Sequence, residues 1–86
     1  MSSSSLFQSV YVLTNKEYHA KWDQEALQKL KVPTVRVFNK GVAAMHALKE
    51  DKPDILLCDG VLDDMDGLAF IHAMRKDQDL KKLPVI

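Results

Sequence analysis

The 86 residues and the neutral formal charge of this chain limit both its architecture and its partners. A chain of this length buries only about 60% of its unfolded surface, so it forms one small core. Hydrophobic residues make up 47% and charged residues 28%, which is typical of a folded domain. Twelve Lys and Arg balance twelve Asp and Glu, which argues against nucleic-acid binding because phosphate neutralisation requires an excess of cations.

The cysteine content and the length of the apolar runs bear on the cellular location of the protein. Cys58 is the one cysteine, so no internal disulfide can form and we expect a cytoplasmic location. The apolar runs are a few residues long, far below the roughly 20 that cross a bilayer, so we expect no membrane span. The opening segment 1–8 lacks the basic patch and the long apolar stretch of a signal peptide, and we interpret it as a flexible tail.

Strand-like segments alternate with segments of helical periodicity along the rest of the chain. Residues 10–13 (VYVL) are typical of a strand buried on both faces, residues 34–38 (TVRVF) are β-branched and aromatic, and residues 54–58 (DILLC) form a third predicted strand. Predicted helices cover 16–31 and begin again near Gly41 and at Gly67. Their apolar stripes are Tyr18, Trp22, Ala26 and Leu30 with Leu27 beside them, then Val42, Met45 and Leu48, and then Leu68, Ile71 and Met74.

The alternation predicts an α/β fold with three layers, in which a parallel sheet is covered by helices. Val85 and Ile86 form the start of a fourth strand. Sheets of this kind place their sites at the carboxyl ends of strands, near the point where the strand order reverses. We therefore expect a site formed by Thr14 and Asn15 after the first strand and by Asp59 after the third.

Four aspartates lie between the third strand and the third helix, within eight residues. Asp59 follows the strand directly, where a carboxylate can attack phosphorus or bind a hard cation such as Mg²⁺. Asp66 precedes Gly67 and is predicted to cap the third helix. Asp63 and Asp64 are interpreted as solvated turn residues.

The spacing between Asp59 and Met65-Asp66-Gly67, followed by the closing Leu83-Pro84-Val85-Ile86, occurs in a known family. The stretch 53–86 resembles the central part of a bacterial response-regulator receiver domain, and the resemblance spans residues 9–86. It implies a flavodoxin-like receiver topology, incomplete after the start of the fourth strand. The resemblance therefore predicts a receiver-like domain over residues 9–86.

The resemblance also implies a reaction and its partners. A histidine kinase or a phosphotransfer protein would donate a phosphoryl group to Asp59 with the help of Mg²⁺. Beyond this self-catalysed transfer we expect no enzymatic activity. In the family, an acidic pair after the first strand, the acceptor and the backbone carbonyl two residues beyond it hold the ion. By position, the acidic pair corresponds to Thr14 and Asn15, the acceptor to Asp59, and the backbone carbonyl to that of Val61.

The acidic pair is missing from this sequence. Asn15 is left as a weak candidate ligand, so the Mg²⁺ affinity is expected to fall steeply. Glu17 and Asp63 are the nearby carboxylates that could compensate in part. Two hypotheses therefore stay open: a phosphoacceptor receiver domain, and a pseudo-receiver that acts as a protein-interaction or dimerisation module without phosphorylation.

Other features bear on assembly. The family's Thr or Ser after the fourth strand and Lys after the fifth would fall beyond Ile86, so we expect the chain to be a fragment or the ordered part of a longer polypeptide. The sheet edge beside the third strand would favour homo-oligomers or strand exchange. His19, His46 and His72 lie on separate predicted helices and are interpreted as surface residues without a ligand role.

Overall fold

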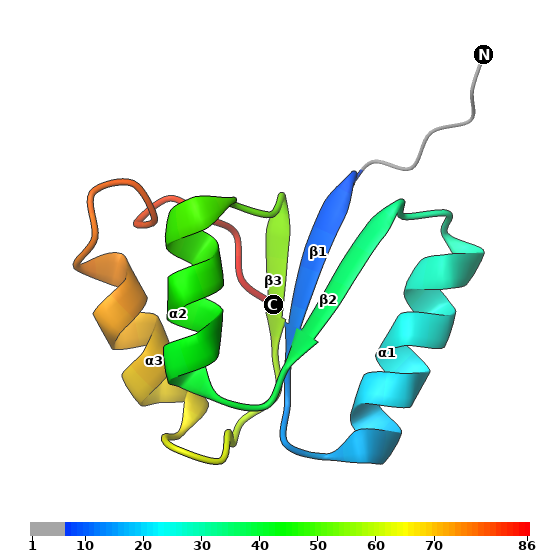
Figure 1. The fold of residues 1–86 in the computed structure, drawn as a ribbon, viewed down its shortest axis with the longest axis horizontal. Helices are drawn as coiled ribbons and strands as arrows, with labels where there is room; N and C mark the ends of the chain where they lie inside the picture. Colours follow the sequence, from blue (N-terminus) through cyan, green and yellow to red (C-terminus); the bar gives the residue numbers. More distant parts are fainter. Residues whose placement is uncertain (1–6) are drawn as a thin grey trace.

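A parallel sheet lies between two layers of helices in the computed structural model, which describes residues 7–86 (Figure 1). The elements are β1 (Ser9–Leu13), α1 (Glu17–Lys29), β2 (Thr34–Phe38), α2 (Gly41–Glu50), β3 (Ile55–Cys58) and α3 (Gly67–Arg75). Helix α1 covers one face of the sheet, and α2 and α3 lie side by side on the other (Figure 1). The predicted three-layer α/β class is thus confirmed. Most of the predicted tail 1–8 falls outside the described residues, so that domain boundary stays a prediction.

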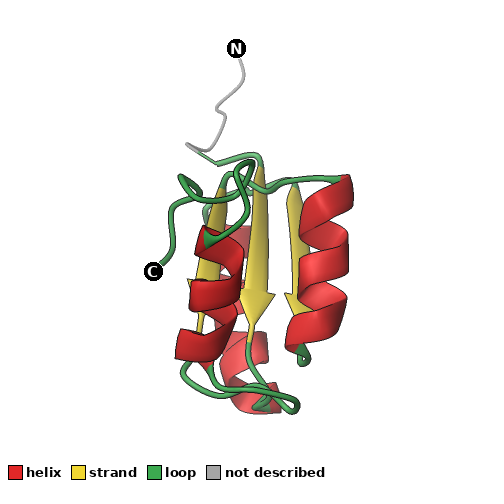
Figure 2. Cartoon of the chain, turned by 90° about the vertical axis from the view of Figure 1, so that its left-hand side faces the viewer, coloured by secondary structure: helices red, strands yellow, loops and turns green. Residues whose placement is uncertain are grey.

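The strand order is β2-β1-β3, and β1 pairs in parallel with both neighbours. Val12 sits opposite Val37 on one side and opposite Leu57 on the other. Figure 2 shows the arrowheads of the strands pointing toward the same edge of the sheet, where loops gather. The carboxyl ends of the strands therefore share one edge, which is the edge at which the sequence predicts a site.

The end of the chain runs beside β3 as the start of a fourth strand. The Leu56 N–H donates to the Pro84 carbonyl at 3.0 Å, and the Ile86 N–H donates to the Leu56 carbonyl at 2.9 Å. Leu56 and Val85 form a parallel bridge. The prediction of a fourth strand next to the third is confirmed, and β3 is flanked on both sides.

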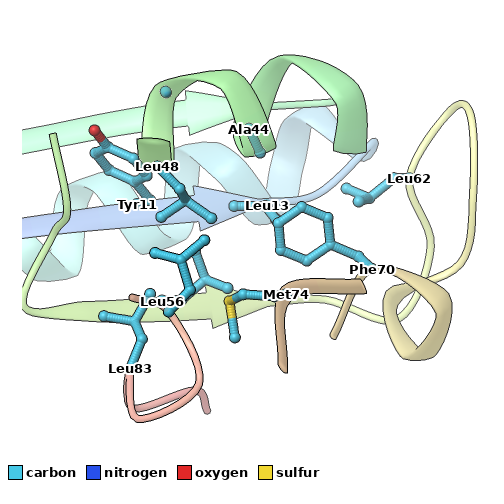
Figure 3. Close-up of a cluster of buried hydrophobic side chains, with 11 residues drawn as sticks. Tyr11, Leu13, Ala44, Leu48, Leu56, Leu62, Phe70, Met74 and Leu83 are labelled. Atoms are coloured by element: carbon cyan, nitrogen blue, oxygen red, sulfur yellow. The ribbon is translucent and has the colours of Figure 1, made fainter. Parts of the chain in front are cut away.

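Strand periodicity divides the core into two clusters. Tyr11 and Leu13 point toward α2 and α3, whereas Val10 and Val12 point toward α1, because successive strand residues face opposite sides of a sheet. Figure 3 shows the first cluster, in which Phe70 lies among Leu13, Ala44, Leu62 and Met74. Each fully buried large side chain contributes about 1.5–3 kcal/mol.

The predicted apolar stripes of the helices are only partly right. In α1 the buried residue is Leu27, while Tyr18, Trp22 and Leu30 are 52%, 62% and 63% exposed. Helix α1 packs over β1 and β2, and the described chain places no second helix beside it. The flank that carries Tyr18 and Trp22 therefore stays in solvent. The prediction that these two aromatic residues belong to the packed stripe of the helix is wrong.

The predicted stripes of the other two helices are right in Leu48 and Met74, which are buried, and in Met45 and Ile71, which pack against the core, but the packed faces extend further round each helix. The α2 residues buried are Gly41, Ala44, Ala47 and Leu48, and the α3 residues buried are Gly67, Phe70 and Met74. Val42 and Leu68, which were expected to face the core, are 58% and 72% exposed. Small residues allow a helix to approach the sheet closely, so the packed face need not be the one with the largest side chains.

Helix α1 ends at Lys29, two residues earlier than expected. Lys31 has a positive φ of 62°, its N–H donates to the Gln28 carbonyl, and the Val32 N–H donates to the Leu27 carbonyl at 3.1 Å. This pair of bonds is a Schellman motif, and Leu27 and Val32 belong to the same apolar cluster, as that motif favours. A left-handed turn at Lys31, rather than the proline that follows, terminates the helix.

Candidate functional site

The candidate site lies where β1 and β3 end. The Asp59 N–H donates to the Leu13 carbonyl at 2.8 Å, and the Thr14 N–H donates to the Phe38 carbonyl at 3.0 Å. These bonds continue the sheet one residue beyond each strand and fix Asp59 beside Thr14. The expectation that the two positions meet at the carboxyl edge is confirmed.

One oxygen of the Asp59 carboxylate carries two side-chain contacts. Thr14 Oγ1 donates to Asp59 Oδ2 at 3.0 Å, and His19 Nδ1 lies 2.5 Å from the same oxygen. Thr14 is buried, and its hydroxyl also accepts the Lys16 N–H at 3.1 Å, so this hydroxyl both donates and accepts. The cluster ties the loop after β1 and the first turn of α1 to Asp59.

The hydrogen bond from His19 lowers the pKa of Asp59 below its ordinary value of 3.8, and the Thr14 hydroxyl and the charge of Lys16 act in the same direction against the opposing effect of burial. Asp59 is therefore ionised at neutral pH. The anion is held by donors from this chain.

The position of His19 corrects the sequence interpretation. This residue was expected to lie on the surface without a ligand role, yet it contacts Asp59 from α1. The sequence did contain an indication that His19 lies near the site, because the first turn of a helix that follows a strand begins at the carboxyl edge of the sheet. His19 lies in that turn, five residues after Thr14.

The remaining aspartates of the loop have structural roles. Asp66 Oδ1 accepts the Ala69 N–H at 2.7 Å, which confirms the predicted cap of α3. The Asp64 carboxylate accepts the N–H groups of Gly41 and Val42 at 2.7 and 3.1 Å, and these bonds lower its pKa. Asp64 thus caps α2, whose own N-cap residue supplies no side-chain bond.

Asp63 and Asp64 are exposed turn residues, as interpreted from the sequence, but both also make hydrogen bonds to other parts of the chain. Asp63 Oδ2 accepts an Asn39 side-chain N–H at 3.0 Å, and the Asp63 N–H donates to the Asn39 carbonyl. Asp63 is therefore bound to the loop before α2 and does not replace the missing acids beside Asp59. Sequence spacing could not show this, because the partners are more than twenty residues apart.

A close backbone approach explains the glycine that follows Asp66. A Cβ on Gly67 would lie 3.0 Å from Cys58 Sγ and 3.3 Å from the Gly60 carbonyl oxygen. The Gly67 N–H donates to that carbonyl at 2.8 Å. Burial raises the pKa of the Cys58 thiol, with the Asp59 charge adding to the effect, so Cys58 behaves as a packing residue.

The residues carried over for Mg²⁺ do not fit a hard divalent cation well. Asp59 is the one carboxylate of that set, and its Oδ2 is taken by His19 and Thr14. Asn15 is exposed in the bend after β1, and neither it nor the Val61 backbone is hydrogen-bonded to Asp59. Within residues 7–86, no group of three or more His, Cys, Asp and Glu side chains is arranged to hold a metal ion. Mg²⁺ prefers a site with more carboxylate oxygens.

No helix in the described part of the chain has the length and apolar character needed to span a membrane.

Comparison with known proteins shows the family. The sequence model of the response regulator receiver domain matches residues 10–86. The polar-differentiation response regulator DivK of Brucella anthropi is 28% identical over 78 residues, which is 91% of this chain and 63% of DivK. The chain thus spans less than two thirds of that relative's length.

Solved receiver structures share the fold. The phosphorylated cyanobacterial phytochrome response regulator RcpA has a TM-score of 0.81 and 27% identity, covering 91% of this chain and 61% of RcpA. The Mn²⁺-bound form of the response regulator Rcp1 has a TM-score of 0.81 and 22% identity, covering 91% and 62%. The chain belongs to the response regulator receiver domain family of two-component signalling.

Proposed function

We propose that this receiver domain acts as a pseudo-receiver, a protein-interaction module that works without phosphorylation of Asp59. The observation that carries the proposal is the occupation of Asp59 Oδ2 by His19 and Thr14. Thr14 stands at one position of the family's acidic pair, and His19 contacts the same carboxylate oxygen from α1.

The chemistry of phosphoryl transfer supports this proposal. A phosphoryl group in flight carries spread negative charge, and an anionic acceptor repels it unless a divalent ion and a fixed cation offset the charge. Thr14 and Asn15 are neutral where the family has carboxylates, and the hydroxyl of Thr14 is already hydrogen-bonded. The hydrogen bond with His19 stabilises the free carboxylate, which opposes its conversion into an acyl phosphate.

Phosphorylation of Asp59 is the second candidate, and a specific observation favours it. The side chain is 34% exposed at the carboxyl edge of the sheet, and its hydrogen bonds involve Oδ2 rather than Oδ1. Oδ1 is thus the atom that would attack phosphorus. The similarity to RcpA, which was solved in phosphorylated form, also supports this candidate.

Incubation with a small phosphodonor and Mg²⁺, followed by intact mass measurement, separates the two candidates. We expect no phosphoryl adduct on the protein, while RcpA in the same mixture serves as the positive control. An adduct that Asp59→Asn abolishes would overturn the pseudo-receiver proposal and establish phosphoacceptance. The variant His19→Gln tests whether the ion pair alone blocks the reaction, since an adduct would then appear only when His19 is removed.

The partners follow from the same proposal. A histidine kinase or a phosphotransfer protein is the expected class of partner, with binding that does not require phosphate on Asp59. Homo-oligomers or strand exchange are a further expectation, which light scattering of the purified protein would test. The chain end covers the outer edge of β3, so pairing would have to use another edge of the sheet. Four expectations stay predictions. They are that the domain has no enzymatic activity of its own, that this segment binds no nucleic acid, that it does not associate with a membrane, and that it is located in the cytoplasm.

A further inference from the structure

An apolar groove runs between α2 and α3, on the side of the sheet opposite α1. It is lined by Val42 and Met45 of α2, by Phe70 and Ala73 of α3, and by Met65 of the loop before α3. The two helices lie side by side at this place (Figure 1). The hollow measures about 330 Å³, which is at the lower end of the range for small-molecule sites in proteins.

Glycine and methionine give this groove its shape. A Cβ on Gly41 would lie 2.6 Å from Met65 Sδ, so the bare backbone of Gly41 allows Met65 to lie against the start of α2. Met45 and Met65 are both partly buried against the main core cluster. Methionine side chains are flexible and polarizable, and they adapt to ligands of varied shape.

The two ends of the groove differ in charge. At the N-terminal end of α2, the Asp64 carboxylate caps Gly41 and Val42. Further along the helix, His46 and Lys49 border the groove, and no carboxylate is among its lining residues. Lys49 forms no ion pair with any residue in 7–86. The unpaired ammonium group of Lys49 therefore lies at one end of the apolar groove.

We propose that the α2–α3 groove binds a linear apolar carboxylate of the medium-chain fatty acid class. The apolar chain would lie along Val42, Met45 and Ala73, and the carboxylate would meet Lys49. The distance along α2 from Val42 to Lys49 is about 10 Å at the rise of an α-helix, which suits a short extended chain. This site does not involve Asp59, so it would supply an input that is independent of phosphorylation.

Octanoate and octanol are suitable probes, because they share an apolar chain and differ in charge. Methionine methyl groups labelled with carbon-13 report the site by NMR. We expect octanoate at millimolar concentration to shift the Met45 and Met65 methyl signals saturably and to leave Met74, which is fully buried and does not line the groove, unshifted. Equal shifts of all three signals, or no saturable shift, would overturn the proposal.

Two pairs of variants test the groove and its charge. Ala73→Leu fills the groove and should weaken octanoate binding at least about fivefold, whereas Ala43→Leu, at an exposed α2 position outside it, should not. Lys49→Gln should weaken octanoate about threefold and leave octanol unchanged, with Lys29→Gln on α1 as the matched control. Binding that Ala73→Leu leaves intact, or a Lys49→Gln effect that is equal for both probes, would refute the assignment. Phosphorylation of Asp59 would not affect these outcomes.

Discussion

A double-mutant cycle across His19 and Asp59 would measure the interaction that distinguishes this site. The variants are His19→Gln, Asp59→Asn and the double substitution, and the quantity compared is the free energy of unfolding. The cycle removes the contributions that each side chain makes alone, so the remainder is the coupling between the two.

The structure sets the expected size of that coupling. His19 Nδ1 and Asp59 Oδ2 are 2.5 Å apart, and the two side chains are 31% and 34% exposed. Fully exposed ion pairs contribute about 0.2–1 kcal/mol, and hydrogen bonds to charged groups contribute about 1.5–3 kcal/mol. Because about two thirds of each side chain is shielded, we expect a coupling of about 1 kcal/mol.

Urea unfolding followed by far-ultraviolet circular dichroism is the appropriate assay. A small domain has an m-value of about 1 kcal/mol/M, so a loss of 1 kcal/mol lowers the midpoint by roughly 1 M. This change is measurable against a total stability of roughly 4–13 kcal/mol for a chain of this size. A coupling below about 0.2 kcal/mol, with effects that simply add, would refute the pairing of His19 with Asp59.

Four further predictions concern the same structure. His19→Gln should raise the pKa of Asp59 toward its ordinary 3.8 in a carbon-detected NMR titration, and an unchanged pKa would contradict the stated cause of the shift. In the natural chain the ionised Asp59 contributes stability above pH 3.8, which is lost as the pH falls through the lower folded-state pKa, and His19→Gln should reduce this dependence. Lys31→Gly should raise the free energy of unfolding by about 0.5–1 kcal/mol, because glycine adopts the positive φ without the cost that lysine bears; a lower melting temperature in calorimetry would contradict the Schellman turn. Asp66→Ala should lower the free energy of unfolding by about 1 kcal/mol through loss of the bond to Ala69, and an unchanged denaturation curve would show that this cap contributes nothing.

Much of the fold could be predicted from local patterns. The strand runs and the change of period at each helix identify the alternating elements, and β2 lies at its predicted residues 34–38. The faces of the helices could not be predicted in the same way. The packed face depends on which neighbours cover a helix, so Trp22 in α1 is exposed although its spacing fits an apolar stripe.

The site was predictable in its placement and not in its contacts. Asp59 and Thr14 meet because both follow parallel strands that are neighbours in the sheet. The bond from His19 depends on the direction of a side chain in the first turn of α1. The capping of α2 by Asp64 depends on how a loop folds back across the sheet edge. Contacts of this kind are set by tertiary packing, which short sequence patterns do not encode.

Titration of the protein with Mg²⁺, followed by the fluorescence of Trp22, tests the central claim most directly. Trp22 borders the same hollow as His19 and Asp59, so an ion bound there would change its environment. We expect no saturable change with the natural chain at millimolar Mg²⁺ and a saturable change once Thr14→Asp and Asn15→Asp restore two carboxylates. Saturable millimolar binding by the natural chain, abolished by Asp59→Asn, would contradict the account of a receiver domain whose ion site has been replaced by its own side chains.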